Sequence, residues 1–388
     1  MGRRTRIKDV RCLITAALLS ATVLAASTTA QAATGFITVA SPNPGTNYNE
    51  IDGVAAVASS NAWAVGFQRS TGLLFHVLVE HWNGSSWSVA ASASLPSSHD
   101  TRLHAVAALS GTNIWAVGSN TTETATSTNS QSLIEHWSGS SWSVVPSPAG
   151  EPADSELLGI AAVSASDIWA VGHSTVEVGE SGSLIEHWNG SAWSVVSSPA
   201  LSAYGYLTGV AAVSSDDVWA VGRDGRHPTP IIENWNGSAW AQVSQPVSGY
   251  DSALNSVAVV NGSDVWAVGE QNLNQTVTER WNGTSWTLVP SPSVTANGAQ
   301  DTLGAVIALG SGDVWAVGST LQNPVSSTLA EQWNGTAWQI VPTTNPEAGS
   351  NVLDTVAGTA AGQPLWAAGY GTSSGTPPTA TLIETTTG

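Results

Sequence analysis

Two carboxylates, Asp52 and Asp354, form the pair in this sequence that is best suited to acid–base chemistry. Most glycoside hydrolases use two such groups, one on each side of the bond that is cleaved. Both residues stand at matching points of a repeated segment, and other copies place imidazole, guanidinium, carboxylate or aromatic groups at equivalent or nearby points. These residues are Phe67, His104, His173, Arg223, Glu270 and Tyr370. The mixture suits a pocket for a polar ligand if the fold brings the copies together.

The repeated segment is about fifty residues long and occurs seven times. A Trp-Ala-Val-Gly sequence or a near copy places Trp at 63, 115, 169, 219, 266, 315 and 366. A second motif, of the type "EHWNGSAW", supplies Trp pairs at 82/87, 137/142, 188/193, 235/240, 281/286 and 333/338. Together the two motifs account for all 19 Trp residues. A period of this length is typical of propellers and other repeat architectures.

Each copy predicts four short strands. A run such as "GVAAV" (209–213) is followed by a turn, then by "VWAVG" (218–222), whose Gly we expect to end the second strand. A strand of the type "SLIEHW" leads through Asn-Gly into a fourth strand, "WSVV", as Asn-Gly between apolar runs usually does. Strands that are apolar on both faces need cover on both sides, which radial packing of four-stranded sheets provides. The pattern predicts an all-β, seven-bladed β-propeller of antiparallel blades.

The two ends of the chain predict how the ring closes. The seventh copy stops at "TLIETTTG" (381–388), after its third strand, whereas "GFITVASPNPG" (35–45) matches a fourth strand with Phe36 in the Trp position. We therefore expect a strand at 36–41 to complete the last blade. The prediction is one domain over 34–388, with repeats that start near 51, 103, 157, 207, 254, 303 and 353.

The first 33 residues have the layout of a secretory signal peptide. Basic residues precede the apolar run "CLITAALLSATVLAA", and "AQAA" ends at Ala33. We expect cleavage near this point and a secreted, extracellular, monomeric protein.

Composition excludes several classes of function. Without residues 1–33 the chain has no Cys and no Lys. It has five Arg and 27 Asp and Glu residues, which gives a formal net charge of −22. Thiolate catalysis and disulfides are therefore excluded. Nucleic acid and anionic membranes are not expected partners, since both bind clustered Lys and Arg.

The order of motifs in "WAVG…IEHWNGSAWSVVSSP" (169–199) resembles a kelch unit of the galactose-oxidase central-domain superfamily. Kelch units have a Gly in the second strand, a Trp after a third-strand hairpin, and an exit through Pro. The resemblance covers about 36–388 and implies a propeller. It departs from the family in having one Gly where kelch repeats have two, and "EHW" where they have Tyr. Fold transfers through such a likeness, but function does not.

Residues that recur in every copy are expected to serve packing. We expect the Trp residues to lie between blades, where each removes roughly 150–250 Å² from water. One acid per copy occupies the "EHW" position, and we expect it to accept hydrogen bonds from indole or backbone N–H groups; the excess of acids leaves a structural calcium ion as an alternative. These acids are Glu80, Glu135, Glu186, Glu233, Glu279, Glu331 and Glu384. Otherwise we expect no cofactor and no metal site.

Function is expected where the copies differ. The loops joining the second strand to the third, and the fourth strand to the next copy, vary in length and sequence and lie at one end of an antiparallel meander. Loops on a rigid scaffold are a usual place for binding. At the mouth of the channel on this face we predict a ligand site of Asp52, Phe67, His104, His173, Arg223, Glu270, Asp354 and Tyr370.

No catalytic motif recurs in the chain. A Tyr–Cys copper site requires Cys, a sialidase requires clustered Arg, and no phosphate loop or nucleophile elbow is present. The sequence favours a non-catalytic protein that binds an extracellular glycan or protein on the variable-loop face. The alternative is a carbohydrate-active hydrolase or lyase that uses carboxylates at the channel mouth, Asp52 and Asp354 being the pair.

Overall fold

The computed structural model describes residues 35–386 except 124–127, 149–153, 178–179, 200, 202–203, 226–227, 248–250, 273, 295–298, 361 and 376. The predicted signal peptide, Arg226 and Tyr250 lie outside the described residues. Residues 33–388 form one compact unit. Within the described part of this unit all regular structure is strand, and no helix long and apolar enough to cross a membrane occurs there.

The strands form seven four-stranded sheets, called blades 1 to 7 in chain order. Blade 1 contains β2 (Tyr48–Ala58), β3 (Asn61–Arg69), β4 (His76–Trp82) and β5 (Trp87–Val89). Blade 2 contains β6 (Asp100–Ser110), β7 (Asn113–Glu123), β8 (Thr128–Trp137) and β9 (Trp142–Val144). Blade 3 contains β10 (Ser155–Ser164), β11 (Asp167–Glu177), β12 (Glu180–Trp188) and β13 (Trp193–Val195). Blade 4 contains β14 (Tyr206–Ser214), β15 (Asp217–Asp224), β16 (Thr229–Trp235) and β17 (Trp240–Gln242).

The remaining three blades follow the same order. Blade 5 contains β18 (Ala253–Asn261), β19 (Asp264–Gln271), β20 (Gln275–Trp281) and β21 (Trp286–Leu288). Blade 6 contains β22 (Gln300–Gly310), β23 (Asp313–Gln322), β24 (Val325–Trp333) and β25 (Trp338–Ile340). Blade 7 contains β26 (Asn351–Ala357), β27 (Trp366–Thr372), β28 (Thr379–Thr386) and β1 (Phe36–Thr38).

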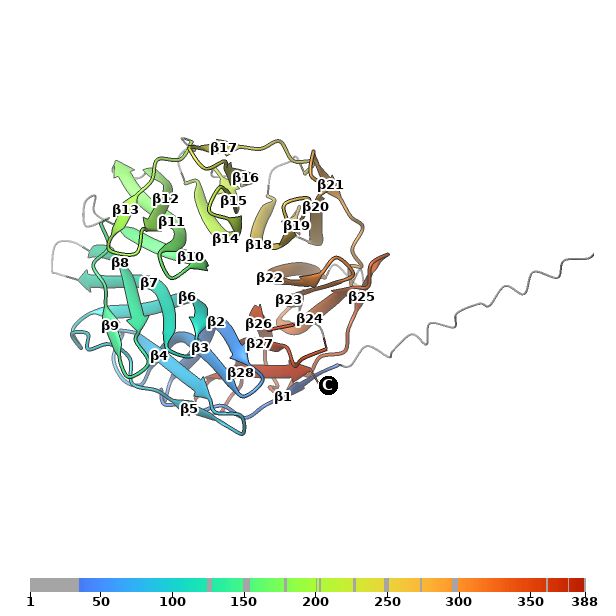
Figure 1. The fold of residues 1–388 in the computed structure, drawn as a ribbon. Coiled ribbons are helices and arrows are strands. Elements are labelled where there is room, and N and C mark those ends of the chain that lie inside the picture. Colours follow the sequence, from blue (N-terminus) through green and yellow to red (C-terminus); the bar gives the residue numbers. More distant parts are fainter. Residues whose placement is uncertain are drawn as a thin grey trace, which may run out of the picture. The chain divides into compact units, whose positions relative to one another are not determined.

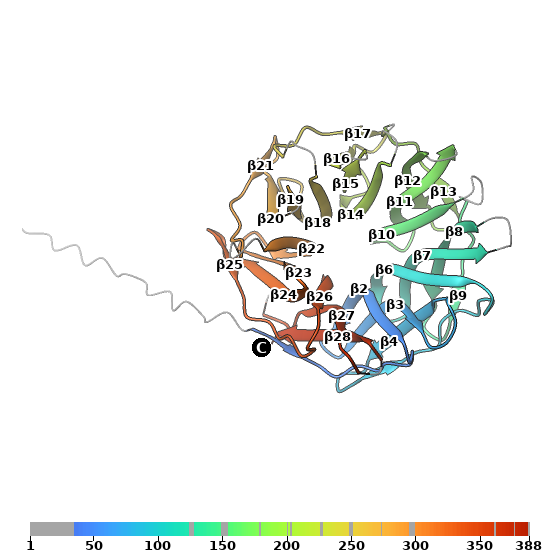
Figure 2. The ribbon, with the colours of Figure 1, turned by 180° about the vertical axis from the view of Figure 1, so that it is seen from behind.

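The blades stand side by side in a ring, with the first strand of each nearest the centre (Figure 1). Neighbouring first strands contact one another all the way round, and β26 contacts β2 across the junction of blades 7 and 1. Figure 2 shows the same ring from behind. The predicted all-β, seven-bladed propeller is confirmed.

The N-terminal strand completes the last blade, as predicted. β1 runs antiparallel to β28, with Phe36 opposite Thr386 and Thr38 opposite Glu384. The strand is three residues long, shorter than the expected 36–41, although the Val39 N–H still donates to the Ile383 carbonyl at 2.8 Å. Because both chain ends belong to one sheet, the ring closes through backbone hydrogen bonds.

The Gly of each Trp-Ala-Val-Gly motif does not end the second strand, contrary to the sequence expectation. β3 continues three residues beyond Gly66, and a β-bulge in β2 lies opposite this Gly, because Ile51 pairs with Gly66 while Gly53 pairs with Val65. A Cβ atom on Gly66 would overlap the carbonyl oxygen of Glu50. The Gly is therefore required by close approach of two backbones. The other six blades have the same bulge and Gly.

The Trp residues pack between blades, as predicted. Trp63 of blade 1 lies 4.9 Å from Trp137 and 5.6 Å from Trp142 of blade 2, measured between ring centroids. The same contact recurs at the next four junctions and between blades 7 and 1. At the remaining junction Phe36 replaces Trp. These rings are the cores that join one blade to the next.

The seven "EHW" glutamates are fully buried between blades. Five accept hydrogen bonds from the segment that leaves the preceding blade: Glu135 from the Ala93 N–H, and Glu186 from the Ser147 hydroxyl, for example. Backbone N–H groups of Ala93, Val247 and Thr344 are among the donors, which is one of the two expected donor types. The other donors are hydroxyl groups, and among the described residues no Trp indole donates to these glutamates. The carboxyl oxygens of Glu80 and Glu233 have no partner among the described residues.

At one end of the blades the turn between the third and fourth strands has a recurring structure. At the β4–β5 turn, Asn83 Oδ1 accepts from the Ser85 and Ser86 N–H groups, and Gly84 takes φ of 94°. Four other blades carry the same Asn turn. Because the sheets are antiparallel meanders, the variable loops all lie at the opposite end. We call that end the variable-loop face.

Candidate functional site

The bulge residue of each first strand lines a cavity on the axis of the ring. It has a volume of about 210 Å³. The bulge turns one residue of each blade toward the axis, with a side chain in every blade but blade 6, where the residue is Gly304; re-aiming a side chain is a common role of bulges near functional sites. The seven residues that it places here are Asp52, His104, Leu158, Thr208, Asn255, Gly304 and Asp354. They were expected to open the first strands, but each first strand begins a few residues earlier.

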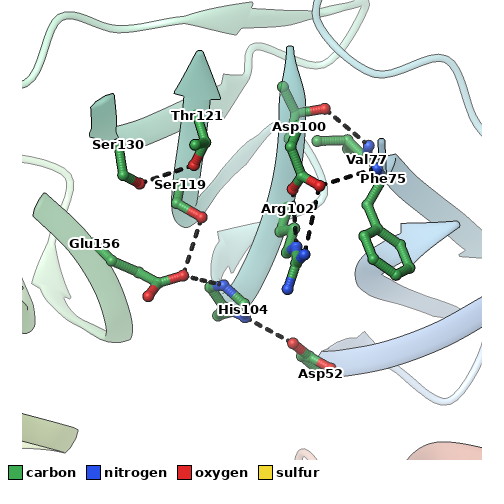
Figure 3. Close-up of polar contacts among 11 residues, drawn as sticks. Asp52, Phe75, Val77, Asp100, Arg102, His104, Ser119, Thr121, Ser130 and Glu156 are labelled. Carbon is green, nitrogen blue, oxygen red and sulfur yellow. Dashed lines mark hydrogen bonds and ion pairs between the residues drawn. The ribbon is translucent and has the colours of Figure 1, made fainter. Parts of the chain in front are cut away.

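His104 joins three blades at the channel mouth. Its Nδ1 lies 2.7 Å from Asp52 Oδ2, and its Nε2 lies 2.7 Å from Glu156 Oε1 (Figure 3). The buried hydroxyl of Ser119 donates to the same Glu156 oxygen at 3.0 Å. Both ring nitrogens therefore face carboxylate acceptors, which an imidazolium satisfies because both of its nitrogens are donors.

The charges of this bridge reinforce one another. Burial opposes protonation of His104, but the hydrogen bonds and negative charges of Asp52 and Glu156 outweigh it and raise its pKa to about 9. Burial likewise works against ionisation of Glu156, yet the contacts with His104 and Ser119 lower its pKa to about 2. A cation held between two acids is suited to fixing the blades and not to accepting a proton.

A second group of acids lies where blades 7 and 1 meet. Burial and the charge of Asp52 raise the pKa of Glu50 to about 7, against the effect of the hydrogen bond that Glu50 accepts from the Tyr48 hydroxyl. Burial and the nearby charges of Asp52 and Glu50 raise the pKa of Asp354 well above its usual range. Oδ2 of Asp354 has no hydrogen-bond partner among the described residues. Both carboxyl groups therefore keep their protons to a higher pH than an exposed carboxyl group does.

The other predicted residues extend around the mouth. Burial, followed by the charges of Asp354 and Glu50, raises the pKa of Tyr370. His173 approaches Glu156 at 4.0 Å, and its ring lies 5.9 Å from that of Tyr206.

Three more predicted residues have contacts of their own. The ring centroids of Phe67 and His104 are 6.3 Å apart, and Cζ of Arg223 lies 4.6 Å from the ring centroid of Tyr206. Glu270 instead accepts a hydrogen bond of 2.6 Å from Thr302 of blade 6. The titratable groups thus extend from blade 7 through blades 1, 2 and 3 to Tyr206 and Arg223 of blade 4, with Glu270 on blade 5.

Sequence reasoning missed the residues directly opposite those that follow each Gly. Glu50 faces Phe67 across the sheet, Glu156 faces His173, and Tyr206 faces Arg223. Each stands two residues before the bulge, on the same side of its strand. Counting back by two from the bulge residue would have found them.

Metal binding finds no support in this arrangement. No group of three or more His, Cys, Asp or Glu side chains in the described parts of the chain is placed to hold a metal ion. A structural calcium ion stays the alternative to the expectation of no metal site.

Comparison with known proteins supports the fold. No protein-family model and no curated protein matches this chain. Among solved structures, it is similar to YCF48 bound to D1 peptide, with 14% identity, a TM-score of 0.54, and coverage of 91% of this chain and 95% of that one. YCF48 from Cyanidioschyzon merolae has a TM-score of 0.56 at 13% identity, with coverage of 90% and 98%.

Two structures of carbohydrate-related proteins are also similar. The six-bladed Aleuria aurantia lectin, described with a novel fucose recognition mode, has 13% identity and a TM-score of 0.53, and the match covers 78% of this chain and 99% of the lectin. A GH74 xyloglucanase from Xanthomonas campestris has 12% identity and a TM-score of 0.56, with coverage of 86% of this chain and 53% of that enzyme. At these identities the likeness shows the propeller fold alone.

Proposed function

We propose that this chain is a secreted, non-catalytic propeller of kelch type that binds an extracellular glycan or protein on its variable-loop face. The observation that carries the proposal is the contrast between the two ends of the blades. Repeated residues serve packing and turns, while the non-repeated polar side chains extend around the channel mouth from blade 7 through blades 1, 2 and 3 to Arg223 of blade 4. Similar solved propellers include a lectin and a peptide-bound protein, which is consistent with a binding role.

The mouth offers a mixture of groups suited to a polar partner. His104, Asp52 and Glu156 form a rigid bridge, while Tyr370 and Arg223 are partly exposed beside it. Rigid support with a few adaptable polar contacts is the arrangement that binding sites use.

The experiment is a screen of the secreted protein on a glycan array and against a panel of extracellular proteins. Any ligand found is then titrated against Tyr370→Ala and Arg223→Ala, with Thr284→Ala in a turn of the opposite face as the control. We expect affinity to fall about fivefold or more in the first two variants, because each removes a contact worth about 1 kcal/mol, and to be unchanged in the third. Equal affinities in all three variants, or no ligand in either screen, would overturn the proposal.

One observation favours the alternative of a carbohydrate-active hydrolase or lyase. Burial raises the pKa of Asp354 well above its usual range, while Asp52 contacts His104, and two carboxyl groups in such different environments are what an acid and a base require. If this alternative holds, reducing ends will appear in a polysaccharide panel, and Asp354→Asn will abolish their release. If the panel gives no turnover, the hydrolase is excluded for those substrates.

Secretion, a monomeric state and the domain limits 34–388 belong to the same proposal. Processing near Ala33 is checked by N-terminal sequencing of protein recovered from the culture medium, and the monomer by light scattering. The calcium alternative predicts a higher melting temperature with calcium than with chelator, and equal melting temperatures would exclude it.

A further inference from the structure

A second cavity of about 260 Å³ lies beside the axial channel, between blades 2 and 3. Its lining residues come from the variable-loop ends of β6, β7 and β8 and from β10 (Figure 3). All of them are polar: Asp100, Arg102, Ser119, Thr121, Ser130 and Glu156. We call this cavity the inter-blade pocket. None of the six belongs to the predicted ligand site.

The charges of the inter-blade pocket are already compensated. The Arg102 guanidinium bonds Asp100 through Nε at 2.9 Å, and His104 supplies a positive charge to Glu156 at 2.7 Å. A site whose acids and bases are paired in this way offers little net attraction to an ionic ligand. The pocket is therefore suited to a neutral polar molecule, although the chain as a whole is strongly acidic.

The polar side chains are held in place by contacts outside the pocket. The Arg102 guanidinium lies 4.4 Å from the ring centre of Phe75 and 5.0 Å from that of Phe67. Asp100 Oδ2 accepts the Phe75 N–H at 3.1 Å. Stacking and a backbone bond thus fix both members of the ion pair, so binding a ligand would cost little side-chain entropy.

The same side chains keep hydrogen-bonding capacity for a ligand. The Arg102 side chain is 35% exposed. Glu156 Oε2 makes no hydrogen bond among the described residues, and His173 Nε2 lies 4.0 Å from it. Thr121 donates to Ser130 at 2.9 Å, which leaves the Ser130 hydroxyl a proton to donate. The pocket therefore offers both donors and acceptors. Adjacent hydroxyl groups of a ligand, each of which can donate and accept, would match them.

We propose that the inter-blade pocket binds one neutral sugar residue of a glycan, with Arg102 and Glu156 taking its hydroxyl groups. The size supports a single unit, because pockets for drug-sized ligands measure roughly 300–1,000 Å³. The lining disfavours an apolar peptide side chain, since the six residues that form it are all polar, and it offers several groups to the adjacent hydroxyls of a sugar. This inference rests on the proposed binding function and gives that function a ligand class and a place.

The test is calorimetric titration of the intact protein with neutral methyl glycosides of fucose, mannose, galactose, glucose and xylose. Glucosamine and glucuronic acid serve as charged counterparts. Arg102→Ala removes the main donor, and Thr121→Val keeps the side-chain shape but removes the hydroxyl. Ser198→Ala is the matched control, because it breaks a similar hydroxyl pair with Ser183 in blade 3. Thermal melting of each variant reports whether it is folded.

We expect at least one neutral glycoside to bind more tightly than the charged sugars. Both pocket variants should lower the affinity for this glycoside about tenfold or more, while Ser198→Ala should leave the affinity unchanged. If Arg102→Ala fails to fold, Thr121→Val decides. A glycoside that binds equally well to Thr121→Val overturns the inter-blade pocket but leaves the proposed binding function standing. Absence of binding by every neutral glycoside overturns the sugar assignment, and the protein panel then decides the proposed function.

Discussion

Phe36 packs edge-on against Trp315, with ring centroids 5.8 Å apart and planes at 86°. Phe36 is the first residue of β1 and Trp315 belongs to blade 6, so this contact ties the N-terminal strand to the end of the ring. It takes the place that a Trp pair occupies at the other junctions. The stability of the whole ring should therefore depend on Phe36, which is far in sequence from the blade that it completes.

Phe36→Ala should lower the free energy of unfolding by about 3–5 kcal/mol, the usual loss for a buried aromatic ring. Ile37→Ala is the neighbouring control, and because Ile37 is 46% exposed it should change stability by less than about 0.5 kcal/mol. Denaturant unfolding measures the unfolding free energy of both variants. Deletion of residues 34–42 should lower this free energy more than either substitution does. A truncated protein that melts like the intact chain would show that β1 does not close the ring.

The buried glutamates predict that stability falls as pH rises. Burial raises the pKa of Glu80 to about 8, whereas in the unfolded chain it ionises near 4.5. Between these values the unfolded chain releases the proton first, so rising pH favours unfolding, and the dependence ends above about pH 8. Denaturant unfolding at pH 5 and pH 8 should show the loss.

Glu80→Gln is the matching variant for that pH dependence. An amide cannot ionise, so this variant should lose less stability than the wild type between pH 5 and pH 8. Asp216→Asn, at an exposed turn, should leave the dependence unchanged. Identical pH profiles for wild type and Glu80→Gln would contradict the raised pKa of Glu80.

His104→Gln should destabilise the protein most at low pH. In the folded state His104 holds its proton up to about pH 9, against 6.5 for the free side chain, so its contribution is complete below pH 6.5 and is lost as pH rises through 9. Removing one member of a buried charged bridge costs about 3–5 kcal/mol. The difference in stability between wild type and variant should therefore be large at pH 6 and small at pH 10, and a constant difference would refute an imidazolium at this site.

Gly66→Ala tests the bulge. A Cβ at this position would overlap the Glu50 carbonyl, so the two strands must separate, and we expect a loss of about 2 kcal/mol or more. Gly310→Ala is the control, because a Cβ there meets nothing within 4 Å. Thermal melting compares the two. If both variants melt alike, the close approach at the bulge does not explain the repeated Gly.

Much of the fold followed from the repeats. The spacing of Trp63 and its six counterparts set the number of blades, and the match between Phe36 and the hairpin Trp positions identified the strand that closes the ring. The site was anticipated less well. Asp52 and His104 were named, but Glu50 and Glu156 were missed, because the first strands were expected to begin after these residues.

The amino-acid sequence by itself determined the architecture, because every repeat is apolar on both faces of its sheet and a closed ring of such units covers both faces of every blade. Only the tertiary structure decided what the non-repeated residues do. The bulge opposite each Gly of the Trp-Ala-Val-Gly motif turns one residue per blade toward the axis. Blade packing then brings residues about fifty positions apart to within 2.7 Å, as Asp52, His104 and Glu156 show. Such contacts depend on the angle between neighbouring sheets, which no local pattern in the sequence specifies.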